Sequence, residues 1–206
     1  PSPSQEYLKV AHQEPTRLPP GLSQSLLVVL DLNGTLLRRF SKSNFVRRPR
    51  VDELLRYLFA HHQVMVWSSA TPANVADMCA KLFTPAQQAQ LLAVWARDTL
   101  QLSRRQYAEK VQVYKQLSWV WGDGHLQARH GGPARPPWGP ENTVLVDDSE
   151  EKAKSEPFNL LRVHEFDRSP GAAEDDVCDA VVRYLEVLKE QRNVCAYMRT
   201  QPFASA

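Results

Sequence analysis

The sequence predicts a three-layer α/β domain with a mainly parallel central sheet. Three short runs are continuously apolar, as strands covered on both faces are: residues 26–30, 64–67 and 143–146. Polar residues follow each run. Stretches with apolar residues at helical spacing separate these runs, so strands and helices alternate along the chain. Sites in such sheets lie at the carboxyl ends of the strands, so the polar residues that follow the three runs are candidates for one shared site.

The first half of the chain divides into an arm and alternating elements. Residues 1–21 contain five prolines and little periodicity, which indicates an arm laid on the surface or a linker. Residues 51–60 carry apolar side chains at helical spacing and complete a strand-helix-strand unit. A second helix is expected from residue 71 to about residue 83. A stretch of mixed polarity then precedes a third helix, expected around residues 111–121.

The second half contains an irregular segment and a final helix. Residues 122–140 hold nine Gly or Pro among 19 residues, so we expect an irregular loop before the third strand. Apolar residues between Val177 and Leu188 form one face of an amphipathic helix. The expected organisation has three parts: a proline-rich arm over residues 1–21, one domain over residues 22–192 and a C-terminal tail over residues 193–206.

Composition limits the classes of partner and compartment. The 206 residues carry a net charge of +2, with 43% apolar and 23% charged side chains, as a single globular domain does. This charge is too small to require a nucleic-acid or membrane partner, and no run approaches the roughly 18 apolar residues of a membrane span. Cys79, Cys178 and Cys195 lack a C-x-x-C pair, which favours a reducing intracellular compartment over disulfides or zinc. We expect a nuclear or cytoplasmic protein rather than a mitochondrial one.

An aspartate at the mouth of a buried strand, followed by a Gly-Thr turn, is a candidate nucleophile on phosphorus. Asp31 has this position. A mechanism through an aspartyl-phosphate also needs a divalent cation and a fixed ammonium group to neutralise negative charge. Asp147 and Asp148 offer metal oxygens, and Lys115 offers the ammonium group. These residues therefore predict a phosphate site that depends on a divalent cation.

Two further groups of residues are expected to contact a phosphorylated partner. The hydroxyl and amide groups of Ser68 and Ser69 follow the second strand and suit phosphate oxygens. Six cations also lie within 13 residues after the first strand: Arg38, Arg39, Lys42, Arg47, Arg48 and Arg50. A solvated hairpin explains this cluster most simply. Its position beside the site also allows Arg47 and Arg48 to bind an acidic or phosphorylated partner.

The order of these motifs resembles the haloacid-dehalogenase-like phosphatase superfamily: DLNGT, then VWSSA, then a lysine, then VLVDDS. Longer segments resemble the branch that contains the RNA polymerase II C-terminal-domain phosphatases and the NLI-interacting-factor-like proteins: RRPRVDELLRYL, VWSSATPANVADM, VYKQLSWVW and VLVDDSEEKAKSEPFNLLRVHEF. The resemblance spans roughly residues 26–166. It implies a nearly capless Rossmannoid fold, Mg²⁺ as cofactor and a protein phosphorylated on serine or threonine as substrate.

The resemblance also assigns roles to single residues. In this family the first aspartate of the DxDGT motif is the nucleophile, and the aspartate two residues later is the general acid and base. Carried over to this sequence, the roles are as follows: nucleophile Asp31; metal ligands Asp31, the backbone carbonyl of Asn33, and Asp148; phosphate contacts Thr35, Ser68 and Lys115.

Asn33 departs from the family motif because it stands where the second aspartate is expected. An amide cannot protonate a leaving alkoxide or deprotonate the attacking water, and such assistance is typically worth about 10²–10⁴-fold. Three interpretations remain open: a slow phosphatase, a binding protein that kept the pocket, and an engineered trap of an active enzyme. A non-catalytic adaptor is the main alternative to an enzyme. A nucleic-acid 3′-phosphatase is a third class, for which we would expect a more extensive basic groove.

Overall fold

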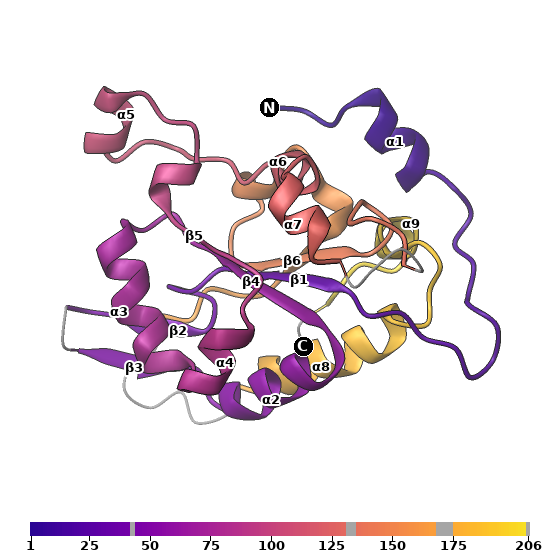
Figure 1. Cartoon of the computed structure of the whole chain (residues 1–206), viewed down its shortest axis with the longest axis horizontal. Helices are drawn as coiled ribbons and strands as arrows, with labels where there is room; N and C mark the ends of the chain where they lie inside the picture. The colour runs from indigo at the N-terminus through magenta and orange to yellow at the C-terminus, as the bar shows by residue number, and fades with distance from the viewer. Residues whose placement is uncertain (42–43, 131–134, 168–174, 205–206) are drawn as a thin grey trace.

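A five-stranded parallel sheet, in the order β5-β4-β1-β6-β7, forms the centre of this computed structural model (Figure 1). The structure describes residues 1–41, 44–130, 135–167 and 175–204. The strand bounds are β1 (Leu27–Leu30), β4 (Gln63–Trp67), β5 (Val94–Trp95), β6 (Thr143–Asp147) and β7 (Leu160–Arg162). Three of these strands, β1, β4 and β6, coincide with the predicted apolar runs. The expected α/β fold with a mainly parallel sheet is therefore confirmed.

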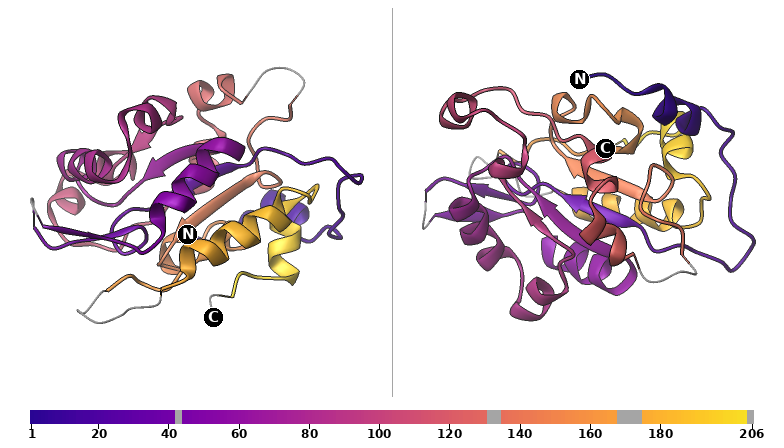
Figure 2. Two further views of the ribbon diagram at one scale, coloured as in Figure 1. Left: turned by 90° about the horizontal axis from the view of Figure 1, so that it is seen from below. Right: turned by 45° about the horizontal axis from the view of Figure 1, so that its top comes forward.

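Successive side chains of β1 enter two separate apolar cores, one on each face of the sheet. Val28 and Leu30 belong to the core covered by three helices: α2 (Val51–His61), α3 (Pro72–Leu82) and α8 (Val177–Leu188). Leu27 and Val29 belong to the core covered by α6 (Leu117–Trp121) and α7 (Gly124–Ala128). Figures 1 and 2 show these two groups of helices on opposite sides of the strands. Burial on both faces explains why the central strands are continuously apolar.

The remaining elements connect and border these layers. Between β1 and α2 lies an antiparallel hairpin of β2 (Leu37–Arg39) and β3 (Phe45–Arg47). The short helices are α4 (Pro85–Gln90), α5 (Arg104–Ala108) and the 3₁₀ turns η1 (Arg97–Thr99), η2 (Glu151–Ala153) and η3 (Pro157–Asn159). Across the described residues, every helix falls short of the length and apolarity of a membrane span.

The segment predicted as one irregular loop over residues 122–140 contains α7. This prediction was wrong at residues 124–128. It rested on the high glycine and proline content and did not consider that Asp123 could cap a helix. The Asp123 carboxylate accepts hydrogen bonds from the backbone N–H groups of His125 and Leu126, both at 2.9 Å. An aspartate in this position satisfies N–H groups that a helix start leaves unpaired, so it supports a helix despite Gly124 at the first position.

Both chain ends carry helices that pack on the domain. α1 (Gln5–Ala11) lies within the predicted arm, and α9 (Val194–Thr200) lies within the predicted tail. The hydroxyl of Tyr7 accepts a hydrogen bond from the backbone N–H of Phe158 at 2.9 Å. The side chain of Asn193 donates to the carbonyl of Val10 at 3.0 Å. The predicted bounds of 1–21, 22–192 and 193–206 remain a prediction, to which the structure adds these two packed helices.

Arg48 is a buried residue that joins three segments around the end of β1. Its side chain is 1% exposed and forms an ion pair with Asp175 at 2.9 Å. It also donates to the carbonyls of Thr35 at 2.7 Å and His164 at 2.8 Å, and its cationic group lies 5.1 Å from the ring centre of Phe166. The prediction that Arg48 contacts a partner is therefore wrong, because a buried guanidinium group cannot reach a partner surface.

Replacing Arg48 with methionine should destabilise the fold by roughly 3–5 kcal/mol, because the Asp175 carboxylate would remain buried without its partner. Arg47→Met is the matched control, since the ion pair of Arg47 with Asp52 is exposed and should contribute at most about 1 kcal/mol. Urea denaturation of both variants measures the difference. Equal losses of unfolding free energy in the two variants would contradict this structural role.

A hydrogen-bonded chain at the opposite end of the sheet holds His62 neutral. The Nδ1 atom of His62 accepts from the backbone N–H of Leu26 at 3.2 Å, so its proton lies on Nε2, 3.2 Å from the hydroxyl of Tyr57. That hydroxyl lies 2.6 Å from a carboxylate oxygen of Glu186. Burial, together with the positive charges of His61 and Lys189, lowers the pKa of His62 to about 4. The folded protein therefore resists protonation of this imidazole.

Stability should fall as the pH decreases from about 6.5 to 4. An unfolded histidine takes up a proton near pH 6.5, whereas folded His62 does so only near pH 4. Across this window the unfolded chain binds more protons, so acid favours unfolding by roughly 3 kcal/mol. Urea titrations at pH 7 and pH 4 should show that His62→Gln removes this part of the loss. His125→Gln, at an exposed site, should retain it; the same pH dependence in both variants would exclude His62 as its source.

Candidate active site

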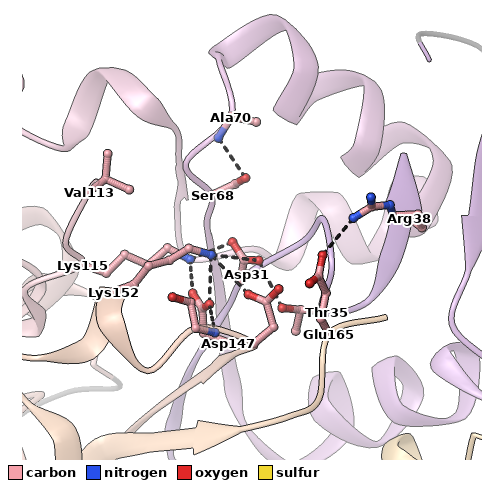
Figure 3. Close-up of polar contacts among 12 residues, drawn as sticks. Asp31, Thr35, Arg38, Ser68, Ala70, Val113, Lys115, Asp147, Lys152 and Glu165 are labelled. Atoms are coloured by element: carbon pink, nitrogen blue, oxygen red, sulfur yellow. Dashed lines mark hydrogen bonds and ion pairs between the residues drawn. The ribbon is translucent and has the colours of Figure 1, made fainter. Parts of the chain in front are cut away.

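Three neighbouring strands end in polar residues that meet at one edge of the sheet (Figure 3). Leu30 at the end of β1 is level with Val66 of β4 and Val146 of β6. The next residues include Asp31, whose backbone N–H donates to the carbonyl of Val146 at 3.0 Å, and Asp147, which is fully buried. The structure thus brings together the carboxylates that the sequence placed at strand ends.

Lys115 lies between these two carboxylates. Its ammonium group is 2.7 Å from Asp31 Oδ1 and 2.6 Å from Asp147 Oδ2, and its side chain is fully buried. The helix predicted over residues 111–121 begins only at Leu117, so Lys115 precedes it. The reason is a cross-chain contact: the backbone N–H of Lys115 donates to the carbonyl of Lys152 at 2.8 Å, where a helix would direct it to its own preceding turn.

Lys152 is a second cation of the site, and the sequence interpretation did not include it. Its ammonium group lies 3.0 Å from Asp147 Oδ1, 3.3 Å from Asp148 Oδ1 and 3.8 Å from Asp31 Oδ2. It extends from the turn η2 back toward the end of β6 (Figure 3). The spacing Asp-Asp-Ser-Glu-Glu-Lys was the available signal, because a lysine four residues after Asp148 can fold back onto it in a turn.

Burial and the paired charges set the ionisation of the cluster. Burial disfavours a charged Asp147, but the ammonium groups of Lys115 and Lys152 outweigh this effect and lower its pKa to about 2. Burial and the neighbouring carboxylates of Asp147 and Asp31 raise the pKa of Asp148 to about 6, although the ammonium group of Lys152 opposes this rise. Burial alone would lower the pKa of Lys152, but the three carboxylates raise it above its ordinary value. The site therefore keeps Lys152 and Asp147 charged.

The turn after β1 brings the backbone against Asp148. Gly34 has a φ of 87°, and a Cβ atom added to it would lie 2.6 Å from Asp148 Oδ2. Only glycine tolerates both the positive φ and this close approach. The turn also directs the hydroxyl of Thr35 back to the predicted nucleophile Asp31, where it donates to Oδ2 at 3.1 Å. Thr35 is therefore positioned beside Asp31, and its contact with phosphate stays a prediction.

The side chain of Asn33 is hydrogen-bonded to the adjoining hairpin. Its Oδ1 atom accepts a hydrogen bond from the backbone N–H of Arg39 at 2.8 Å, and Asn33 is itself exposed. A carboxylate at this position could accept the same hydrogen bond. The geometry of the hairpin is thus compatible with either residue, whereas proton transfer is possible only with the acid.

The two serines after β4 differ from their predicted roles in one respect. The backbone N–H of Ser68 donates to the carbonyl of Trp95 at 3.0 Å and belongs to the pairing of β4 with β5, so this amide is not available to phosphate. The Ser68 hydroxyl accepts from the N–H of Ala70 at 3.2 Å and can still donate its own proton. Ser69 follows at the edge of the site and is half-buried.

Most described cations of the predicted basic cluster are paired with carboxylates. Arg38 contacts Glu165 at 3.0 Å, Arg50 contacts Asp179 at 2.8 Å, and Arg47 contacts Asp52. Lys42 lies outside the described residues. Because these pairs offset the positive charge, the surface of the hairpin attracts an acidic partner less than its sequence suggested.

The donor set of the site fits a hard divalent cation. One carboxylate oxygen from each of Asp31, Asp147 and Asp148 lies within 4.8 Å of the other two. Mg²⁺ prefers oxygen ligands, and it is usually bound by one or two carboxylates together with water or phosphate. Asp31 and Asp148 of the predicted ligand set are thus adjacent, while Asp147 is engaged by both lysines.

Known proteins are similar to this chain in sequence or in structure. The chain is 36% identical over 191 residues to an uncharacterized FCP1 homology domain-containing protein of Schizosaccharomyces pombe, covering 86% of this chain and 77% of that protein. The solved structure of Fcp1, an essential RNA polymerase II CTD phosphatase, is similar with a TM-score of 0.47 and 13% identity, covering 88% of this chain. A beryllium fluoride complex of fission yeast Fcp1 has the same TM-score and 11% identity. The chain spans 55% of the length of each structure.

The match to a family model covers most of the chain and includes every residue of the site. The model describes the NLI interacting factor-like phosphatases, and it matches residues 26–195. This range starts immediately before β1 and ends at the first turn of α9. The chain therefore belongs to the NLI interacting factor-like phosphatase family.

Proposed function

We propose that this chain is an aspartate-based phosphatase for phosphoserine or phosphothreonine in a protein, with slow turnover because Asn33 replaces the general acid and base. The observation that carries the proposal is the environment of Asp31. One oxygen of its buried carboxylate faces the Lys115 ammonium group, and the other accepts from the hydroxyl of Thr35. A carboxylate held by both oxygens at a strand end is oriented for attack on phosphorus.

In this mechanism an oxygen of Asp31 attacks the phosphoryl group and forms an aspartyl-phosphate, while the P–O bond to the serine or threonine breaks and the leaving oxygen takes its proton from water. Lys115 stabilises the negative charge of the phosphoryl oxygens, and Asp147 fixes the position of Lys115. The hydroxyl of Ser68 donates to the same oxygens, and that of Thr35 turns from Asp31 to do so once the phosphoryl group is bound. Water then hydrolyses the aspartyl-phosphate. Mg²⁺, which Asp31, Asp148 and the carbonyl of Asn33 would hold, supplies additional positive charge when it is bound.

A groove beside Asp148 supports a protein substrate. Its volume is about 850 Å³, and its lining carries charges of both signs, with Asp148, Glu150, Glu151 and Glu165 beside Lys154 and Arg162, together with His164. The groove is open to solvent, and both polar and apolar groups line it, as a site for an extended peptide requires. Membership of a phosphatase family that resembles Fcp1, named for its action on the C-terminal domain of RNA polymerase II, also favours a phosphoprotein substrate.

A catalytically inactive adaptor is the second candidate function. The exposed Asn33 favours it, because this amide cannot transfer the proton that a serine leaving group needs. The adaptor would bind a protein partner at the same groove without hydrolysis. Activity assays with Asn33 and Asp31 variants separate the two functions.

Asn33→Asp should raise hydrolysis of a phosphoserine peptide by about 10²–10⁴-fold and that of an activated aryl phosphate much less. A phenolate leaves without a proton, whereas a serine alkoxide requires one, so the missing acid costs more for the peptide. Phosphate release with both substrates, with and without Mg²⁺, measures the two ratios. Asn44→Asp, an equal change of charge at an exposed position in the loop between β2 and β3, should leave both rates unchanged. No gain for either substrate in Asn33→Asp would favour the adaptor.

Asp31→Asn should abolish hydrolysis of both substrates, because an amide oxygen does not form the aspartyl-phosphate. Rapid acid quenching of the unmodified chain with radiolabelled aryl phosphate should trap a phosphorylated protein, since Asn33 slows hydrolysis of the intermediate. Asp31→Asn should give no label, while Asp98→Asn at an exposed site should give the full amount. Undiminished labelling of Asp31→Asn would place the nucleophile elsewhere.

A further inference from the structure

The ammonium group of Lys152 lies among the three carboxylates that would otherwise share a divalent cation. It is 3.0 Å from Asp147, 3.3 Å from Asp148 and 3.8 Å from Asp31. The same carboxylates form the group whose oxygens gather within 4.8 Å of one another. Because Mg²⁺ requires oxygen atoms at about 2.1 Å, the ion and the ammonium group compete for the same oxygens.

The position of Lys152 is fixed at both its backbone and its side chain. Its carbonyl accepts the backbone N–H of Lys115 at 2.8 Å, which links the two cation-bearing segments. Its side chain is only 16% exposed and extends alongside that of Lys115 (Figure 3). Lys154, two residues later, provides a contrast: its side chain is 50% exposed and pairs with Glu151 at the surface. The two lysines of this short segment therefore have different surroundings.

The charges of the cluster depend strongly on Lys152. Three carboxylates face two ammonium groups, and removal of Lys152 would leave Lys115 alone against all three. Charges that are buried at these distances interact far more strongly than they do in water. A cluster without Lys152 would therefore need another cation to remain assembled.

We propose that Lys152 is a built-in counter-cation of this site, a positioning residue that keeps the carboxylates assembled without a divalent ion and weakens the binding of Mg²⁺. The proposal shares its site with the proposed function but does not require turnover. It implies that the chain folds with an ordered site in the absence of metal, and that Mg²⁺ binds only after the ammonium group has moved aside.

Titration calorimetry with Mg²⁺ alone tests the proposal on the unmodified chain, Lys152→Met and Lys154→Met. Methionine keeps most of the side-chain volume and removes the charge, so Lys152→Met should bind Mg²⁺ at least about tenfold more tightly than the unmodified chain. The Lys154→Met control should match the unmodified chain. The melting temperature adds a second measurement: Lys152→Met should melt at a lower temperature in EDTA and recover in Mg²⁺, while the unmodified chain should change little.

Equal or weaker Mg²⁺ binding by Lys152→Met would overturn the proposal, as would a melting temperature of this variant that Mg²⁺ fails to raise. Lys152→Gln repeats both measurements in case methionine prevents folding, since its polar amide suits the cluster better. A merely structural role for Lys152 would lower stability without rescue by the ion. These readouts do not depend on hydrolysis, so failure of the proposed phosphatase activity would be seen separately in the Asn33 and Asp31 variants.

Discussion

The structure depends on the neutralisation of carboxylates that parallel strands bring to one buried edge. Asp31 and Asp147 are at most 1% exposed, and ionised carboxylates at such positions are costly unless cations accompany them. Lys115 and Lys152 come from different connections of the sheet and meet at this edge. The hydrogen bond between their backbones joins the two connections, so the requirement for positive charge also determines how the loops above the sheet are arranged.

The turn after β1 obeys a related constraint, because it must approach the site closely and yet remain rigid. Gly34 allows the approach to Asp148, and its carbonyl accepts the backbone N–H of Phe166 at 2.7 Å. Arg48 holds the carbonyl of Thr35 from the other side. Two segments distant in sequence thus fix the turn that carries Thr35, which orients the carboxylate of Asp31. The ion pair with Asp175 holds Arg48 in place and so helps to position the turn that carries Thr35.

The sequence predicted the parts of this protein that depend on local patterns. The apolar runs located β1, β4 and β6, because burial on both faces leaves a continuous apolar signal. Family motifs located Asp31, Thr35 and Lys115, which the structure brings together. The roles of Lys152 and Arg48 were missed, because each depends on which distant carboxylate faces the side chain. For a lysine or arginine in a polar stretch, the neighbouring sequence does not indicate whether the side chain is buried or solvated.

Asn33 and Lys152 both make the site less negative than an aspartate at position 33 and a neutral residue at position 152 would. An aspartate at position 33 would add a negative charge beside Asp31, and a neutral residue at position 152 would remove a positive one. The chain has neither, so its carboxylates are already largely balanced by its own lysines. Under the proposed function, such a balance would let the site accept a phosphoryl group with less help from a divalent ion, while the amide of Asn33 would supply no proton to the leaving oxygen. Binding of phosphate and turnover would then depend on different residues, so the site could keep the first while the second is slow.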